Sequence, residues 1–165
     1  MIDSTGAQLP AAIAYASPSQ VNYQVPTGAA SGVGKVTITA GGTAVSGTVN
    51  IAAVYPGLFK ASVDNLAAAQ VVTASGTKQV SASAIDLSSG PVYLVLYGTG
   101  IGTSSVTATI GGVNATVAYS GSQGTYPGLD QINLLIPPSL AGKGRVNVVV
   151  TAADKPSNPV YIVIQ

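Results

Sequence analysis

A series of strand and turn motifs occurs twice in this chain of 165 residues, and this internal repeat limits the folds available to it. The segment 20–26, QVNYQVP, returns at 131–137 as QINLLIP. An Ala-Tyr pair precedes each copy. A Gly-rich turn follows each copy and leads into a strand that opens with a basic residue, Lys35 or Arg145. A further apolar strand closes each unit. Matching motifs in the same order predict a duplicated domain.

Short strands joined by tight turns account for most of the sequence. Apolar residues recur with period two or in short runs bounded by Gly, Pro, Ser and Asn, and the charged fraction is only 7%. This pattern predicts an all-β protein of two tandem immunoglobulin-like β-sandwich units. The expected strands are 11–15, 20–25, 34–39, 45–52, 68–73, 79–85, 92–97, 105–110, 114–119, 131–136, 145–151 and 160–164.

The repeat also divides the chain. We expect a first unit at 1–59, a linker with one or two strands at 60–90, and a second unit at 91–165. The second unit opens with the apolar strand 92–97, for which the first unit has no counterpart. Three explanations stay open: the missing strand lies in upstream sequence, the linker folds back to supply it, or another copy donates it.

Five segments of the chain have distinctive motifs, at 15–26, 52–59, 92–100, 110–115 and 128–133. They resemble the duplicated immunoglobulin-like C-terminal domain of secreted Acidobacteria (Solibacter-type) proteins. The resemblance covers nearly the whole chain and implies an exported protein in which the module ends a longer architecture. It transfers no catalytic residue. Members of this family usually carry a strand before the first unit, and this chain lacks it.

Catalytic chemistry finds few usable residues here. The chain has no His, Cys or Glu, which excludes Cys/His zinc sites and leaves a triad without a base. A Ser–Lys dyad has no supporting motif. Asp64-Asn65 and Asp130-Gln131 are conceivable calcium ligands, although capping or solvation explains them better. We therefore expect no enzyme, and no catalytic, cofactor-binding or metal-binding residues. The carboxylates, all aspartates, are Asp3, Asp64, Asp86, Asp130 and Asp154.

Two glycine-rich segments superficially resemble nucleotide-binding loops. The segment 98–102, GTGIG, follows an apolar strand, but the residues after it continue as another strand and not as the helix that a dinucleotide loop requires. The segment 32–35 lacks the spacing and the Ser/Thr of a phosphate loop. We expect a turn at 98–102, and no bound cofactor at either segment.

The charge pattern limits the partners. Six basic residues are scattered through a chain of net charge +1, which argues against nucleic acid and leaves little repulsion between copies. The longest apolar run, 91–97, has the length of a strand and cannot span a membrane. A crosslink between Lys35 and Asp130 or Asp86 is conceivable, but a solvated lysine is the simpler reading.

Tyrosines are the best candidates for contact with a ligand. Tyr15 and Tyr119 occupy equivalent repeat positions, and Tyr55 and Tyr126 both precede Pro-Gly. Such rings can stack on sugars, but in sandwiches they more often bury the ring and bond the hydroxyl to backbone. For the repeat residue Asn133, as for its counterpart in the first unit, we expect a structural bond to neighbouring backbone.

The expected function is a non-catalytic structural or adhesive module, located outside the cell or on its surface. Low charge, duplication and the missing strand favour a subunit of a surface assembly or filament held by β-strand complementation. The alternative is a carbohydrate-binding module attached to a secreted protein.

Overall fold

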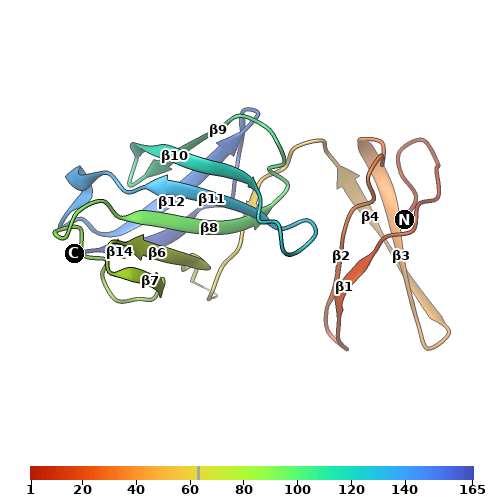
Figure 1. Cartoon of the computed structure of the whole chain (residues 1–165). Coiled ribbons are helices and arrows are strands. Elements are labelled where there is room, and N and C mark those ends of the chain that lie inside the picture. The colour runs from red at the N-terminus through yellow and green to blue at the C-terminus, as the bar shows by residue number, and fades with distance from the viewer. Residues whose placement is uncertain (63) are drawn as a thin grey trace. The chain divides into compact units, whose positions relative to one another are not determined.

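Strands and turns build two units, Met1–Ala53 and Val54–Gln165 (Figure 1). The structure, a computed structural model, describes residues 1–62 and 64–165. These residues contain no α-helix, only the short 3-10 turn η1 at Pro138–Leu140. The all-β class predicted from the sequence is confirmed, and the sheets are open. In the part of the chain described, no helix is long and apolar enough to cross a lipid bilayer.

Unit 1 contains two separate antiparallel strand pairs. Its strands are β1 Ile13–Ala16, β2 Val21–Tyr23, β3 Gly32–Ala40 and β4 Thr43–Ile51. β1 pairs with β2, and β3 pairs with β4. The hairpin between β3 and β4 turns at Gly41-Gly42, where φ is +55° and +81°, the conformation that a two-residue hairpin requires and that glycine adopts freely.

Unit 2 contains one continuous sheet, with ten strands among the described residues. Its strands are β5 Gly57–Leu58, β6 Ala69–Thr73, β7 Gly76–Gln79, β8 Tyr93–Thr99, β9 Val106–Ile110, β10 Val113–Ser122, β11 Asp130–Leu135, β12 Gly144–Ala152, β13 Lys155–Pro156 and β14 Val160–Ile164. Their hydrogen-bonded order is β13-β12-β9-β10-β11-β8-β6-β7, with β14 added to β12 and β5 to β8. β10 belongs to two ladders: residues 113–115 pair with β9, and residues 116–122 pair with β11.

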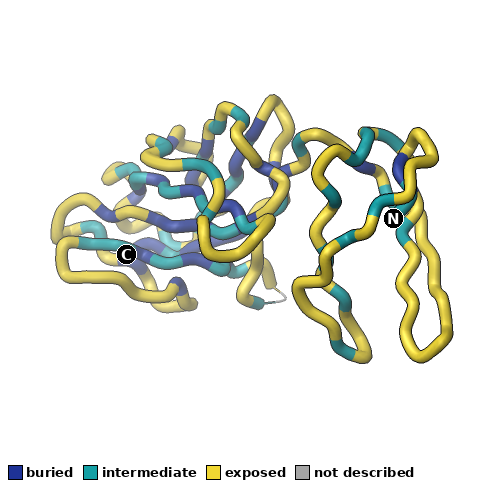
Figure 2. The backbone as a smooth tube through the Cα atoms, turned by 45° about the vertical axis from the view of Figure 1, so that its right-hand side comes forward, coloured by how far each residue is buried: buried dark blue, intermediate teal, exposed yellow. Residues whose placement is uncertain are grey.

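The core of the protein lies in unit 2. One buried cluster contains side chains of β10 and of both its ladder partners, β9 and β11. Strands β6, β8, β12 and β14 also contribute to it. In Figure 2 most of the buried residues lie in unit 2, where they alternate with intermediate ones, whereas the residues of unit 1 are mostly exposed or intermediate. The most deeply buried large residues are Leu94, Leu96, Ile101, Ile110, Ile132, Leu134, Ile136, Ile162 and Ile164.

Most expected strands lie where the pattern placed them, with one clear exception. The expected strand at 79–85 is wrong: β7 ends at Gln79, and the residues that follow pair only at isolated points. Val80 N donates to Ala69 O, and Ile85 exchanges bonds with the end of β14. The segment therefore uses Val80 and Ile85 as buried anchors, although its apolar alternation is typical of a strand.

The segment 60–90, expected as a linker, contributes β6 and β7 to the sheet of unit 2. β6 pairs with β8, placing Gln70 opposite Val95. The division between the units falls after Ala53.

Candidate functional site

Residues at matching repeat positions differ sharply in exposure between the units. Val25 is 45% exposed, whereas its counterpart Ile136 is 2% exposed. Ile38 is 37% exposed, whereas Val148 is fully buried. Among the described residues of unit 1, Ile51 is the one buried hydrophobic side chain. Apolar side chains of unit 1 are therefore exposed at positions where the equivalent side chains of unit 2 are buried within unit 2 itself.

The strand edges differ in the same way. In unit 2, β11 lies between β10 and β8, and the outer edge of β14 is bridged by Leu66 and Ile85. In unit 1, β2 pairs with β1 and β4 pairs with β3, and the described residues place no second strand beside either. β4 is nine residues long and carries neither charge nor proline. A long uncharged edge is a template for pairing with another strand.

A β-bulge sets the direction of one tyrosine in each unit. In unit 2 the register shifts between Val117, which packs on the core, and Tyr119, which lies opposite Asn133. Without this extra residue the alternation of side chains would turn Tyr119 toward the core. Unit 1 has the same shift, and Tyr15 lies opposite Asn22. The bulge was not predicted, because no local residue pattern marks it.

The outer face of β10, β11, β8 and β6 gathers amides and tyrosines. Tyr119 lies opposite Asn133, which lies opposite Val95, which in turn lies opposite Gln70. Opposite residues of an antiparallel ladder share a face. Val95 is 7% exposed and lies outside the core cluster, so it is covered on the outer face of the sheet. We call this surface the amide–tyrosine face, and it consists of Gln70, Tyr93, Tyr97, Tyr119, Gln131 and Asn133.

Hydrogen bonds hold these side chains in place. The Tyr97 hydroxyl donates to Gln70 Oε1 at 2.9 Å, and the Tyr119 hydroxyl donates to the backbone oxygen of Ser122 at 2.6 Å. Gln131 Nε2 donates to Asn133 Oδ1 at 2.9 Å. The asparagine was expected to bond neighbouring backbone, but its partner is the glutamine side chain.

The repeat preserves this bond. In unit 1, Gln20 Nε2 donates to Asn22 Oδ1 at 2.6 Å. Tyr15, on β1, lies opposite Asn22 of this pair. In the same way Tyr119, on β10, lies opposite Asn133 on β11. Each unit therefore carries the same outward trio of one tyrosine, one glutamine and one asparagine.

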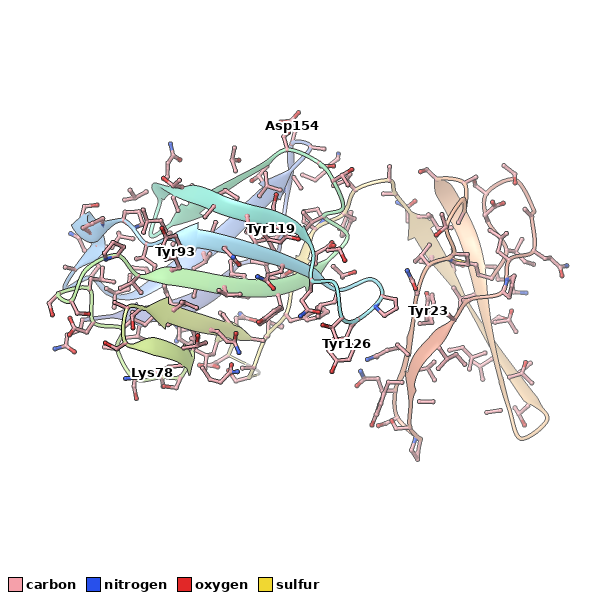
Figure 3. All side chains as sticks on the ribbon, viewed as in Figure 1. Tyr23, Lys78, Tyr93, Tyr119, Tyr126 and Asp154 are labelled. Carbon is pink, nitrogen blue, oxygen red and sulfur yellow. The ribbon has the colours of Figure 1, made fainter. Side chains whose placement is uncertain are left out.

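The other tyrosines lie in different surroundings. Tyr126 is 65% exposed in the loop between β10 and β11 (Figure 3), and Tyr55 is exposed just before β5. Tyr161 is buried, and its hydroxyl donates to Asp64 Oδ2 at 2.6 Å. This bond raises the pKa of Tyr161. The pKa of Asp64 is lowered, first by the Ser62 hydroxyl and then by Tyr161.

The candidate calcium and crosslink residues have other partners. Asp64 binds Ser62 and Tyr161, and Asp130 accepts from the backbone N–H groups of Ile101 and Gly102. In the described residues no three carboxylates gather into a metal-binding group. The Lys35 side chain is exposed on β3.

In the glycine-rich segment 98–102, the first two residues end β8 and residues 100–102 form the turn after it. The next element is the strand β9 and not a helix, so the segment does not form the helix N-terminus that a dinucleotide loop presents to its ligand. Gly100 has φ +74°, and a Cβ there would collide with the backbone oxygen of Tyr55. Tyr55 N also donates to Gly100 O, so the two backbone segments lie close together. Glycine at position 100 permits this packing within unit 2.

Two surfaces are thus available for interaction: the open apolar strands of unit 1, and the amide–tyrosine face of unit 2. The first can pair with a strand, and the second can exchange hydrogen bonds with an uncharged ligand. No protein-family model, curated protein or solved structure matches the chain.

Proposed function

We propose that this chain is a non-catalytic extracellular structural or adhesive module, built from two related immunoglobulin-like β-sandwich units. In this proposal copies associate through the open strands of unit 1. The relationship to secreted Solibacter-type proteins is part of the same proposal. The observation that carries it is the exposure of Val25 and Ile38 at positions where unit 2 buries Ile136 and Val148.

The shared register supports the duplication. Tyr15 opposite Asn22 and Tyr119 opposite Asn133 follow a bulge at the same repeat position. Two ladders of unit 2, joined at β10, enclose one core cluster, which is the arrangement expected of a sandwich.

The described residues of unit 1 bury little apolar surface, so we expect unit 1 to be marginally stable without a partner. Two-stranded pairs are marginal alone in water, and small domains without disulfides depend on a sufficient core. The chain has no cysteine. In unit 2 the edge of β11 is closed by β8, and the edge of β14 by residues 66 and 85. A strand from a second copy, added to β2 or β4, would close the matching edges of unit 1.

The partner proposed is unit 1 of a second copy. β8 is buried within its own unit, and so it is not available for donation without unfolding that unit. The strands of unit 1 carry one charge, Lys35, and β4 carries none, so two such edges meet without repulsion. Because β2 and β4 each leave an edge open, association can continue beyond a pair.

Sedimentation velocity over a range of concentrations tests the proposal. We expect mass to rise with concentration. Val45 lies opposite Ile38 on the open face, and Val45→Lys places a charge there. This change should weaken association by about tenfold or more. The control is Val113→Lys, at a valine on β10 of unit 2 that is 39% exposed, against 69% for Val45, and this change should leave association unchanged.

Hydrogen exchange supplies the second readout. Amides of β2 and β4 should gain protection as the concentration rises, while those of β8 stay constant. A protein that is monomeric at every concentration, with unit 1 amides unprotected throughout, would contradict the proposed assembly. Equal loss of association in Val45→Lys and Val113→Lys would contradict the assignment to unit 1.

A further inference from the structure

We propose that the amide–tyrosine face of unit 2 binds uncharged polysaccharide. This inference concerns a different surface from the strand edges of unit 1, and it does not depend on self-association.

The face has the chemistry of a neutral sugar ligand. Tyr93 and Tyr119 are 37% and 42% exposed, and they offer aromatic rings on which the C–H faces of sugar rings can stack. Sugar hydroxyls both donate and accept, as side-chain amides do. Among the described residues, no hydrogen bond involves Gln131 Oε1, Asn133 Nδ2 or Gln70 Nε2. These atoms are left to water or to a ligand.

The absence of charge on this face narrows the class of ligand. Its four central strands, β10, β11, β8 and β6, turn no Lys, Arg or Asp side chain outward. The one charged residue in them, Asp130, is buried and accepts a hydrogen bond from Ile101 N in the turn after β8. An anionic ligand such as a phosphate or a uronic acid would find no cation there. A neutral hydroxylated polymer needs none.

Preorganisation distinguishes the face from an ordinary wet sheet surface. The Tyr97 hydroxyl is bonded to Gln70, and the Gln131 amide is bonded to Asn133, so these side chains hold one orientation before a ligand arrives. The bulge before Tyr119 turns its ring onto the same face. Three rings and three amides on rigid strands form a surface of fixed geometry.

The second copy of the trio is an independent observation. Tyr15, Gln20 and Asn22 repeat the outward arrangement, including the Gln–Asn bond, although the apolar side of unit 1 differs in burial from that of unit 2. Packing of the core therefore does not account for this trio. Two similar sites on one chain suit a polymeric ligand, because the second contact becomes intramolecular.

Retention on insoluble polysaccharides tests the inference. The probes are cellulose, xylan and mannan, with carboxylated cellulose as the anionic comparison. We expect retention on at least one neutral polymer, unchanged by high salt, and no gain on the anionic one. The double variant Tyr93→Ala/Tyr119→Ala should lower the bound fraction about tenfold. Its control is Tyr55→Ala/Tyr126→Ala, which removes two exposed tyrosines outside the face.

A second variant keeps the test decisive if the double variant fails to fold. Gln131→Glu introduces a charge and removes the donor to Asn133 with little change in shape, and it should also weaken retention. Failure of the folded wild-type protein to bind any of the three neutral polymers would overturn the inference. Equal losses in the Tyr55/Tyr126 control would also overturn it, since the site would then lie elsewhere.

Discussion

The side chain of Asn158 pairs with the backbone of Leu58 as a neighbouring strand would. Asn158 Oδ1 accepts from Leu58 N at 2.8 Å, and Nδ2 donates to Leu58 O at 3.0 Å. One residue, 100 positions away in the sequence, thus satisfies both polar groups of a buried strand residue on β5.

Asn158→Ala should therefore destabilise unit 2. It leaves the N–H and C=O of Leu58 without partners, which costs about 1–3 kcal/mol in the free energy of unfolding. Asn158→Asp keeps the acceptor but loses the donor, and it sets a carboxylate against a carbonyl, so it should be no better than alanine. Urea unfolding measures both. Asn114→Ala, at an exposed asparagine on β10, should have almost no effect.

Asp130 connects the start of β11 to the turn after β8. Its Oδ2 accepts from Ile101 N at 2.8 Å and from Gly102 N at 3.2 Å, and Ile101 is fully buried. Asp130→Ala should cost about 2 kcal/mol or more, because two N–H groups lose their acceptor. The Ile101 amide should also lose protection from hydrogen exchange. Asp154→Asn, at an exposed turn, is the control for lost charge. Unchanged exchange at Ile101 would show that the turn holds without the carboxylate.

The stability of unit 1 should depend on pH through Asp3. The pKa of Asp3 is lowered from 3.8 to about 2, mainly by the Ala30 N–H and then by the Thr5 hydroxyl. The folded state therefore binds the proton less readily than the unfolded state, and the stabilisation is present above pH 3.8 and lost as pH falls toward 2. Exchange of unit 1 amides in this window measures the loss.

Asp3→Asn supplies the comparison for that window. It should make unit 1 less stable above pH 3.8 and should flatten the pH dependence below it. If wild type and variant show parallel profiles, another group is responsible.

Arg145 supports unit 2 by stacking on Tyr161. Its guanidinium carbon lies 3.5 Å from the centre of the Tyr161 ring, and Nη2 donates to Asp64 O at 3.1 Å. The ion pair with the Asp64 carboxylate, at 4.0 Å and half exposed, contributes little. Arg145→Lys should therefore lower Tm almost as much as Arg145→Ala, because lysine lacks the planar group. High salt should not reproduce the loss. Lys143→Ala is the exposed control.

Local pattern was sufficient for the positions of most strands. Alternating apolar residues and the Gly41-Gly42 turn predicted β3 and β4 within two residues of their observed ends. The same rule failed at 79–85, where Val80 and Ile85 are anchored to different parts of the sheet. Alternation reports which side chains can be buried, but strand pairing also needs a neighbour along the whole length.

The candidate surfaces were only partly predictable. The repeat identified Tyr15, Tyr119 and the asparagines as equivalent, and the absence of a strand from unit 1 stays a prediction. The membership of Gln70 and Tyr97 in one face was missed, since they come from strands paired across 27 residues of sequence. The available signals were Gln70, within the otherwise apolar segment 68–72, and the placement of Tyr93 and Tyr97 on one side of the strand 92–97.

Side-chain period and turn chemistry act over a few residues, so they were enough to predict the all-β class, the short strands and the repeated order of motifs. Long-range folding, in contrast, sets which repeat positions are covered, where Tyr119 points and which strands share the amide–tyrosine face. Those features depend on contacts between distant segments. Val25 and Ile136 are alike in sequence context, but the fold of unit 2 covers Ile136, whereas the described residues leave Val25 45% exposed.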